Sequence, residues 1–136
     1  MTLTPSGTSL AGACLALAVS LGACASPGSN VPPGTPSGDL LLEATGSGNW
    51  TVDCSATTTR GRDAASDITG RGGDSYDVIA LRDVVSASCR YDAGGEPLTM
   101  TLEEAGIVCP FGDFADGICR TTVAADDTGT LDFTPA

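Results

Sequence analysis

Apolar and polar residues alternate along much of this chain with the period of two that is typical of half-buried β-strands. The clearest run is Trp50 to Cys54, in which Trp50, Val52 and Cys54 share one face. Thr51 and Asp53 share the opposite face, as a strand with one buried side requires. The run predicts a strand, and its single tryptophan is expected to anchor the core.

Other runs of β-branched, apolar or alternating residues predict further short strands. The runs at 85–91 and 98–102 flank a Gly-Gly turn at 92–97 and predict a hairpin whose two apolar faces point at one core. Residues 55–75 are polar and predict a loop, although the threonines at 57–59 could extend the strand before it. The remaining predicted strands lie at 40–44, 76–85, 107–109, 118–123 and 131–133, with 107–109 and 118–123 as a pair. A two-turn helix is the alternative for 76–85, but its β-branched content favours the strand.

About seven short strands, separated by turns every 8–12 residues or so, predict an all-β fold. The expected architecture is a small antiparallel sandwich or barrel. A domain of this size buries only a modest core, so covalent cross-links would contribute much of its stability.

Four cysteines lie in the predicted β domain, and an even number in an exported chain indicates two disulfides. Three connectivities are possible, of which we favour Cys54–Cys89 with Cys109–Cys119, because the second pair brackets a short loop rich in turn residues. A zinc site is the rival interpretation. It is disfavoured because the chain contains no C-x-x-C spacing and no histidine.

The N-terminal region ends in Leu21-Gly22-Ala23-Cys24, after an uncharged apolar run at 10–21. The run is shorter than the roughly 20 residues that a membrane-spanning helix needs, but it suits a signal peptide. The tetrapeptide resembles the lipobox of bacterial lipoproteins, and the resemblance covers about the first 26 residues. The first nine residues depart from a usual signal peptide because they contain no Lys or Arg. The alternative is a buried N-terminal helix with Cys24 as a core thiol.

The resemblance implies that residues 1–23 are removed and that Cys24 becomes a lipidated N-terminus. Residues 24–39 then form a flexible tether, because 25–39 hold four prolines and three glycines. The β domain is expected at 40–136. Ala25 follows the lipidated cysteine, and by resemblance to Gram-negative lipoproteins this implies the periplasmic side of the outer membrane.

The net charge is −11, and all six basic residues are arginines. So acidic a chain repels nucleic acid, and we exclude that class of partner. It also disfavours lying flat on anionic lipid, which leaves the acyl chains as the expected membrane contact.

The chain contains no His and no Lys, so the usual bases that activate Ser or Cys nucleophiles are absent. Only carboxylate chemistry is available, for example between Asp113 and Asp116. The same two residues, or Asp74 and Asp77, could offer oxygen ligands to calcium, but solvated turn residues are the better interpretation. We therefore expect no enzyme, no catalytic residue, no bound metal and no cofactor.

The predicted loop at 110–117 contains Phe111 and Phe114, which either form an exposed contact patch or plug one end of the barrel. Separately, the segment 86–91 (SASCRY) loosely resembles a short motif of periplasmic lipoproteins that inhibit lysozyme. The expected function is a non-catalytic binding or structural module with an envelope protein partner. The alternative is an inhibitor of a secreted hydrolase such as lysozyme.

Overall fold

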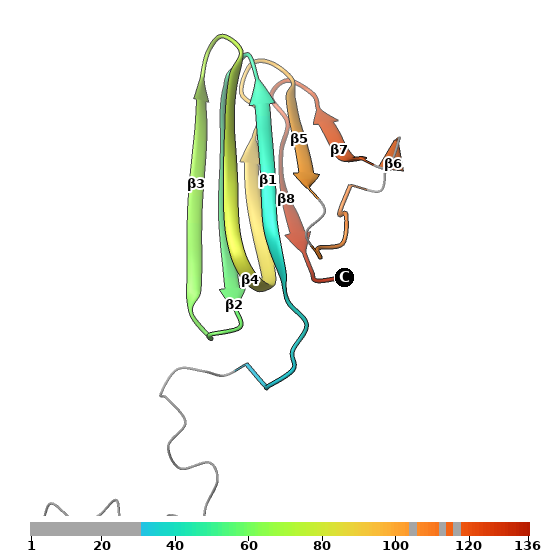
Figure 1. The fold of residues 1–136 in the computed structure, drawn as a ribbon. Coiled ribbons are helices and arrows are strands. Elements are labelled where there is room, and N and C mark those ends of the chain that lie inside the picture. The colour runs from blue at the N-terminus through green and yellow to red at the C-terminus, as the bar shows by residue number, and fades with distance from the viewer. Residues whose placement is uncertain (1–30, 104–105, 112–113, 116–117) are drawn as a thin grey trace, which may run out of the picture.

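The computed structural model describes residues 31–103, 106–111, 114–115 and 118–136, with the side chains of 114–115 left aside. These residues form eight strands, all paired antiparallel, and no helix occurs among them (Figure 1). The predicted all-β antiparallel fold is confirmed, with one strand more than the seven expected. The strands are β1 (Gly38–Gly46), β2 (Asn49–Thr58), β3 (Asp63–Arg71), β4 (Ser75–Asp92), β5 (Leu98–Glu103), β6 (Phe114–Ala115), β7 (Ile118–Val123) and β8 (Thr128–Phe133).

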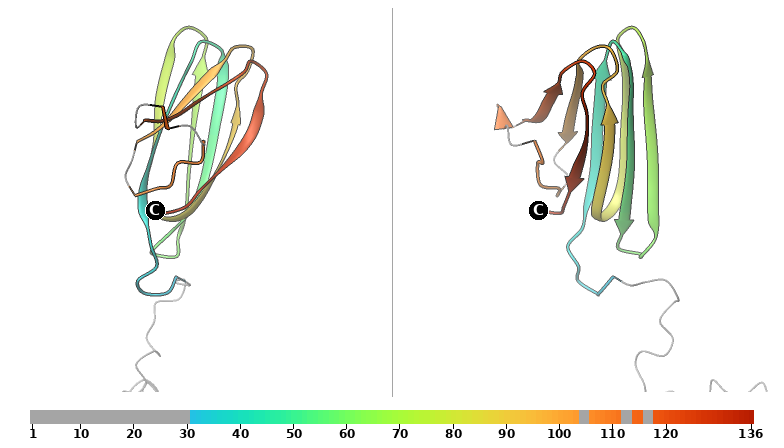
Figure 2. Two further views of the ribbon diagram at one scale, coloured as in Figure 1. Left: turned by 90° about the vertical axis from the view of Figure 1, so that its right-hand side faces the viewer. Right: turned by 180° about the vertical axis from the view of Figure 1, so that it is seen from behind.

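The strands form two layers that share β4. Residues 75–84 of β4 pair with β1, and the layer continues through β5 and β7 to β6. Residues 84–92 of β4 pair with β2 on one side and β8 on the other, and β3 lies beyond β2. The first half of β4 pairs with β1 and the second half pairs with β2. Because β1 and β2 lie in different layers, β4 folds over from one layer to the other (Figures 1 and 2).

Irregular pairing marks the place where β4 folds over. Its register with β1 shifts between Gly38 and Leu40, and its register with β2 shifts between Thr57 and Thr58. On β4 the first shift falls between Leu81 and Val84, and Asp83 within it adopts a left-handed φ of 55°. An extra residue on one strand bends it and increases its twist, so two such irregularities together turn the strand sharply.

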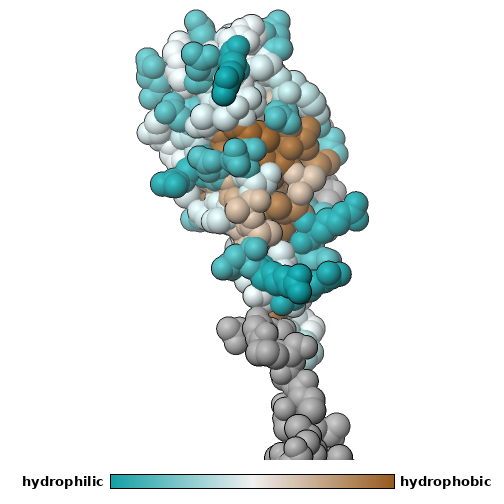
Figure 3. Space-filling model, turned by 90° about the vertical axis from the view of Figure 1, so that its left-hand side faces the viewer, coloured by the Kyte–Doolittle hydropathy of each residue, from teal (hydrophilic) through white to brown (hydrophobic). Residues whose placement is uncertain are grey.

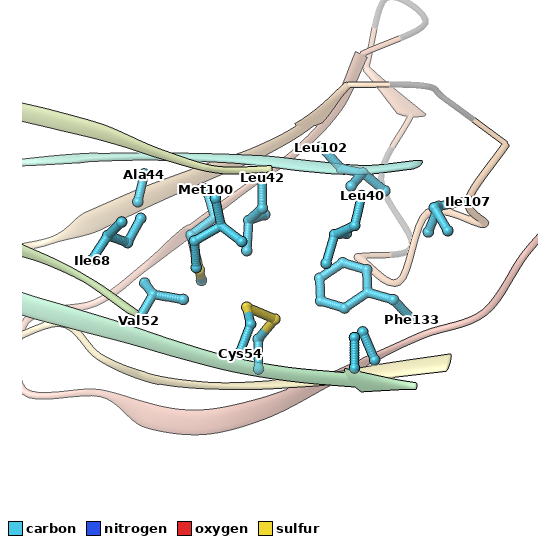
Figure 4. Packing of buried hydrophobic residues seen from close by; sticks show 14 of the residues in the cluster. Leu40, Leu42, Ala44, Val52, Cys54, Ile68, Met100, Leu102, Ile107 and Phe133 are labelled. Atoms are coloured by element: carbon cyan, nitrogen blue, oxygen red, sulfur yellow. A yellow bond between two sulfur atoms is a disulfide. The ribbon is translucent and has the colours of Figure 1, made fainter. Parts of the chain in front are cut away.

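The core fills the space between the layers (Figure 4). β1 contributes Leu40, Leu42 and Ala44, and these point toward Val52 and Cys54 of β2. The alternation predicted for 50–54 is confirmed, because residues 50, 52, 54 and 56 are buried while the residues between them are exposed. Every second residue of β5 is buried as well, which confirms that the 85–91 and 98–102 runs face one core.

Trp50 is the core anchor that the sequence predicts, since only 1% of its surface is exposed. Its indole N–H donates to the Ser75 hydroxyl at 2.9 Å and to the Gly46 carbonyl at 3.3 Å. Ser75 in turn donates to the Gly46 carbonyl at 3.0 Å. The indole therefore ties β1, β2 and the start of β4 together, and its single polar atom is satisfied although it is buried.

Both disulfides have the favoured connectivity. Cys54 and Cys89 lie directly opposite each other on β2 and β4, with their Cα atoms 4.0 Å apart. Cys109 and Cys119 join the segment 106–111 to β7, with a Cα–Cα distance of 5.7 Å. The first bridge closes a sequence separation of 35 residues and the second a separation of 10.

The prediction of a loop at 55–75 is wrong, because this region contains the end of β2 and all of β3. β3 pairs only with β2, so it is an edge strand with one side open to solvent. Its alternate residues Asp63, Asp67 and Arg71 are exposed, and only Ile68 is a large buried side chain. Main-chain bonds to β2 form this strand, and such bonds leave little trace in the hydrophobic pattern.

The predicted hairpin between 85–91 and 98–102 is also wrong. The second half of β4 pairs with β2 and β8, whereas β5 pairs with β1 and β7. The turn at 92–97 thus crosses between layers, and residues 76–85 and 85–91 belong to one long strand. The pairing of 107–109 with 118–123 is wrong too. β7 pairs with β5 and β6, and Ile107 bridges to Pro135.

Two strands leave an edge open on the same side of the molecule: β3, and residues 75–83 of β4. Figure 3 views the side of β3 and shows apolar side chains in the middle of that face, bordered by hydrophilic ones. On the open edge of β4 the Val78 N–H donates to the carboxylate of the adjacent Asp77 at 2.9 Å. An occupied donor and charged neighbours disfavour the addition of another strand.

Candidate functional site

The outer face of the layer β3–β2–β4–β8 presents small and acidic side chains in rows that cross the strands. One row consists of Ala65, Ser55, Ser88 and Asp132, each opposite the next in the register. The neighbouring rows run Asp67, Asp53, Arg90, Thr130 and Asp63, Thr57, Ser86. The residues that alternate with these rows on β2 and β4 point into the core, so the rows face solvent.

Two shallow hollows adjoin on this face. One has a volume of about 590 Å³ and the other about 450 Å³, and Ser55, Ala65 and Ser88 line both. The floor is low there because alanine and serine carry the shortest side chains after glycine. We call this pair of hollows the small-residue trough.

The rim of the small-residue trough is acidic. Asp63 and Asp132 line the first hollow, and Asp53 and Asp67 line the second. Arg90 is the one basic residue that lines either hollow, and it lies directly opposite Asp53 in the register. Four carboxylates against one guanidinium give the trough a negative potential, which favours a cationic partner.

The sequence pattern predicts several of these side chains on the polar faces of strands, but it does not show that these strands are neighbours. Ser55 and the residues of β3 were assigned to a loop, so half of the trough was missed. The segment 86–91, singled out for its resemblance to lysozyme inhibitors, contributes Ser86, Ser88 and Arg90 to the trough. The signal that was available is the alternation of polar residues with Ala87 and Cys89.

The predicted contact loop is only partly described. Phe111 is half-buried and packs against the core, which favours the plug over the exposed patch for this residue. The side chain of Phe114 lies outside the described residues, as do Asp113 and Asp116. Cys24 and the predicted signal peptide also lie outside them.

Asp74 and Asp77 are both exposed, and the Asp77 carboxylate accepts a hydrogen bond from the Val78 N–H. Among the residues that the structure describes, no group of three or more His, Cys, Asp or Glu side chains is placed to hold a metal ion.

Both tyrosines of the chain have a raised pKa. The Tyr76 hydroxyl donates to Glu43 Oε1 at 2.9 Å, and this hydrogen bond, followed by desolvation and nearby carboxylates, raises its pKa above 10.0. For Tyr91 the main cause is burial, followed by the charge of Asp127 and a hydrogen bond to it at 3.4 Å. Each phenol is thus held in its neutral form.

Titration of the phenol absorbance is therefore expected to show both tyrosines ionising above the pH of free tyrosine. Because the folded-state values are raised, the stability from these neutral phenols is present below pH about 10 and is lost as pH rises through the raised values. Glu43→Gln is expected to return Tyr76 toward its ordinary pKa and to leave Tyr91 unchanged. Two unshifted titrations in the unmutated protein would contradict this assignment.

Comparisons with known proteins add no assignment: no family model, curated protein or solved structure matches the chain. The described residues contain no helix of the length and apolar character needed to cross a membrane.

Proposed function

We propose that this protein is a lipid-anchored envelope module that binds a protein partner with a basic surface, without catalysis of its own. The observation that carries the proposal is the small-residue trough, in which short side chains leave room for a partner and four carboxylates provide charge complementarity. Complementary charge steers association and selects partners.

Lipid anchoring is supported by the Leu21-Gly22-Ala23-Cys24 sequence and the apolar run before it. The two disulfides suit an exported protein, because such bonds persist in oxidising compartments. Two or three acyl chains on Cys24 would give a lasting anchor, at about 0.8 kcal/mol per buried methylene. The intact mass of the protein from the membrane fraction tests this: residues 24–136 plus acyl chains is expected, and an unprocessed chain from Met1 would exclude it.

Inhibition of a secreted hydrolase such as lysozyme is the second candidate function. It is favoured by one observation, namely that Ser86, Ser88 and Arg90 of the inhibitor-like segment line the trough. An acidic rim also suits a basic target enzyme.

Ser88→Arg is expected to abolish partner binding, because it places a bulky cation in the centre of the trough. Its neighbours across the strands are Ser55 and Asp132, so the guanidinium has both space and a counter-charge, and folding should be retained. We expect inhibition of a lysozyme to be weaker by about tenfold or more, or an envelope cross-link formed from position 130, which lines the same trough, to be lost. Residual activity in the enzyme assay, and mass spectrometry of the cross-linked partner, provide the readouts.

Thr122→Arg is the matched control. Thr122 is an exposed strand residue on the outer face of the other layer, where it pairs with Thr99. The Thr122→Arg substitution adds the same charge and bulk away from the trough, so partner binding should be unchanged. Equal loss in both variants would show that net charge alone matters, and no loss in Ser88→Arg would remove the trough from the function.

A further inference from the structure

Three of the six arginines line one hollow at the end of the molecule where β1 begins. Arg60 and Arg62 come from the turn between β2 and β3, and Arg82 comes from β4, just before the strand folds over. The hollow has a volume of about 370 Å³. We call it the arginine hollow.

Main-chain hydrogen bonds fix the two segments that carry these arginines. The Arg62 carbonyl accepts from the Thr58 N–H at 3.2 Å and from the Thr58 hydroxyl at 3.1 Å, and Gly61 N–H donates to the Thr58 carbonyl at 2.9 Å. The turn is joined to β4 because Thr59 N–H donates to the Asp83 carbonyl at 2.9 Å. The backbone beneath all three side chains is therefore one connected unit.

The hollow gathers half of the basic residues of a strongly acidic chain. Asp63 and Asp83 also line it, so three guanidinium groups face two carboxylates. In the part of the chain that the structure describes, Arg120 is the one arginine whose side chain makes a hydrogen bond. Among the described residues, none accepts a side-chain hydrogen bond from the three hollow arginines, and a guanidinium fork matches the oxygens of a phosphate group.

The arginine hollow lies beside the start of the tether. Gly38, the first residue of β1, is paired with Val84, and the carboxylate of Asp39 accepts from the Asp83 N–H at 3.0 Å. Residues 31–37 lead into β1 at the same end of the molecule as the β2–β3 turn (Figure 1). Figure 3 shows strongly hydrophilic side chains at this lower end.

We propose that the arginine hollow binds phosphate groups of anionic lipids at the membrane to which the chain is tethered. This rests on the proposed lipid anchoring. Only 13 residues separate Cys24 from the start of β1, so the end of the domain that carries the hollow lies nearest the point of attachment. Each arginine near an anionic surface strengthens attachment by roughly fivefold.

The net charge of −11 does not prevent binding to anionic lipid, because salt screens the carboxylates that lie far from the hollow. The Debye length is about 8 Å at physiological ionic strength, whereas a nine-residue strand such as β3 is about 30 Å long. Carboxylates at the far end are therefore screened from the lipid surface, and the local balance at the hollow decides. The acyl chains are then joined by a second contact that orients the domain and leaves the trough exposed at its side.

Trypsin tests the orientation through an internal control, because it cleaves after arginine and the chain has no lysine. Arg60-Gly61 lies in the membrane-facing turn, and Arg71-Gly72 lies in the turn at the opposite end of β3. Residues 24–136 are attached to vesicles by coupling the Cys24 thiol to a maleimide lipid, so the result does not depend on acylation in the cell. The ratio of cleavage after Arg60 to cleavage after Arg71 is compared on phosphatidylglycerol-containing and pure phosphatidylcholine vesicles at about 0.15 M salt, the physiological ionic strength.

We expect the ratio to fall at least fivefold on the anionic vesicles and to recover at about 1 M salt. Arg82→Gln, which leaves both cleavage sites intact, should reverse most of this protection, whereas Arg120→Gln on β7 should not. An unchanged ratio, or equal effects of the two variants, overturns the proposal. Protection by inorganic phosphate on phosphatidylcholine vesicles would assign the hollow to free phosphate instead, and would also overturn it. A protein that is not acylated in the cell would give the same result in this assay. That outcome would appear only in the intact mass of the protein from the membrane fraction.

Discussion

Removing the Cys54–Cys89 disulfide is expected to lower the free energy of unfolding by about 4 kcal/mol. The bridge closes a sequence separation of 35 residues, and its loss frees the unfolded chain to occupy many more conformations. Both half-cystines are buried, with 4% and 0% of their surface exposed, so the substituted side chains also leave a poorly filled space in the core. The effect is large against a typical domain stability of about 5–15 kcal/mol.

The measurement is chemical denaturation of the Cys54→Ala/Cys89→Ala variant. Its control is Cys109→Ala/Cys119→Ala, which opens a separation of only 10 residues and should cost about 3 kcal/mol. A larger loss in the control pair would show that chain entropy does not rank the two bridges. In that case packing around Cys119, which is fully buried, would be the dominant contribution.

Gly70→Ala is expected to destabilise the fold by about 3 kcal/mol, at the upper end of the range for overpacked sites. Gly70 lies opposite Trp50 in the register of β2 and β3. A Cβ at this position would overlap the indole ring and the Ser75 hydroxyl. The ring cannot withdraw without breaking its hydrogen bonds to Ser75 and Gly46, so the strain falls on the whole end of the sandwich.

Denaturation followed by the fluorescence of Trp50, the single tryptophan, gives both the stability and the state of the indole. The native emission of Gly70→Ala should shift toward that of a more solvated indole. Gly95→Ala is the control, because a Cβ there meets no atom within 4 Å and its stability should be nearly unchanged. Unaltered emission and stability in Gly70→Ala would mean that the indole does not pack on Gly70 in solution.

The two proposed surfaces face different directions and take different partners, although Asp63 and Ala64 line both. The arginine hollow faces the tether, and the small-residue trough lies on the side of the β3–β2–β4–β8 layer. A protein held by its end at a membrane would keep this side accessible to a partner in the surrounding compartment. Variants in one surface are therefore expected to leave the other unaffected, which the Ser88→Arg and Arg82→Gln variants can establish together.

Local pattern alone determined much of this fold. The alternation at 50–54, the apolar run at 40–44 and the run at 131–133 all mark strands, because alternate side chains of a half-buried strand face the core. The cysteine spacing favoured the connectivity that is present, and the lone tryptophan is a core residue. These features depend on a residue and its near neighbours, which is why the sequence reveals them.

Only the tertiary structure decided which strands pair. A period of two indicates which face of a strand is buried, but not which strand lies beside it. Hence the strand at 98–102 was predicted to pair with 85–91, although it pairs with β1 and β7. β3 escaped detection for a related reason, since an edge strand gains its stability from main-chain bonds to one neighbour.

The candidate sites, too, were decided only by the tertiary structure. Ser55 and Ser88 meet because β2 and β4 are adjacent, and Arg60 meets Arg82 because β4 folds over beside the β2–β3 turn. The sequence by itself determined most of the strands, the covalent bridges and an overall negative charge. How that charge is distributed, with an acidic trough on one face and an arginine hollow at one end, follows from contacts between distant segments, and no local pattern encodes such contacts.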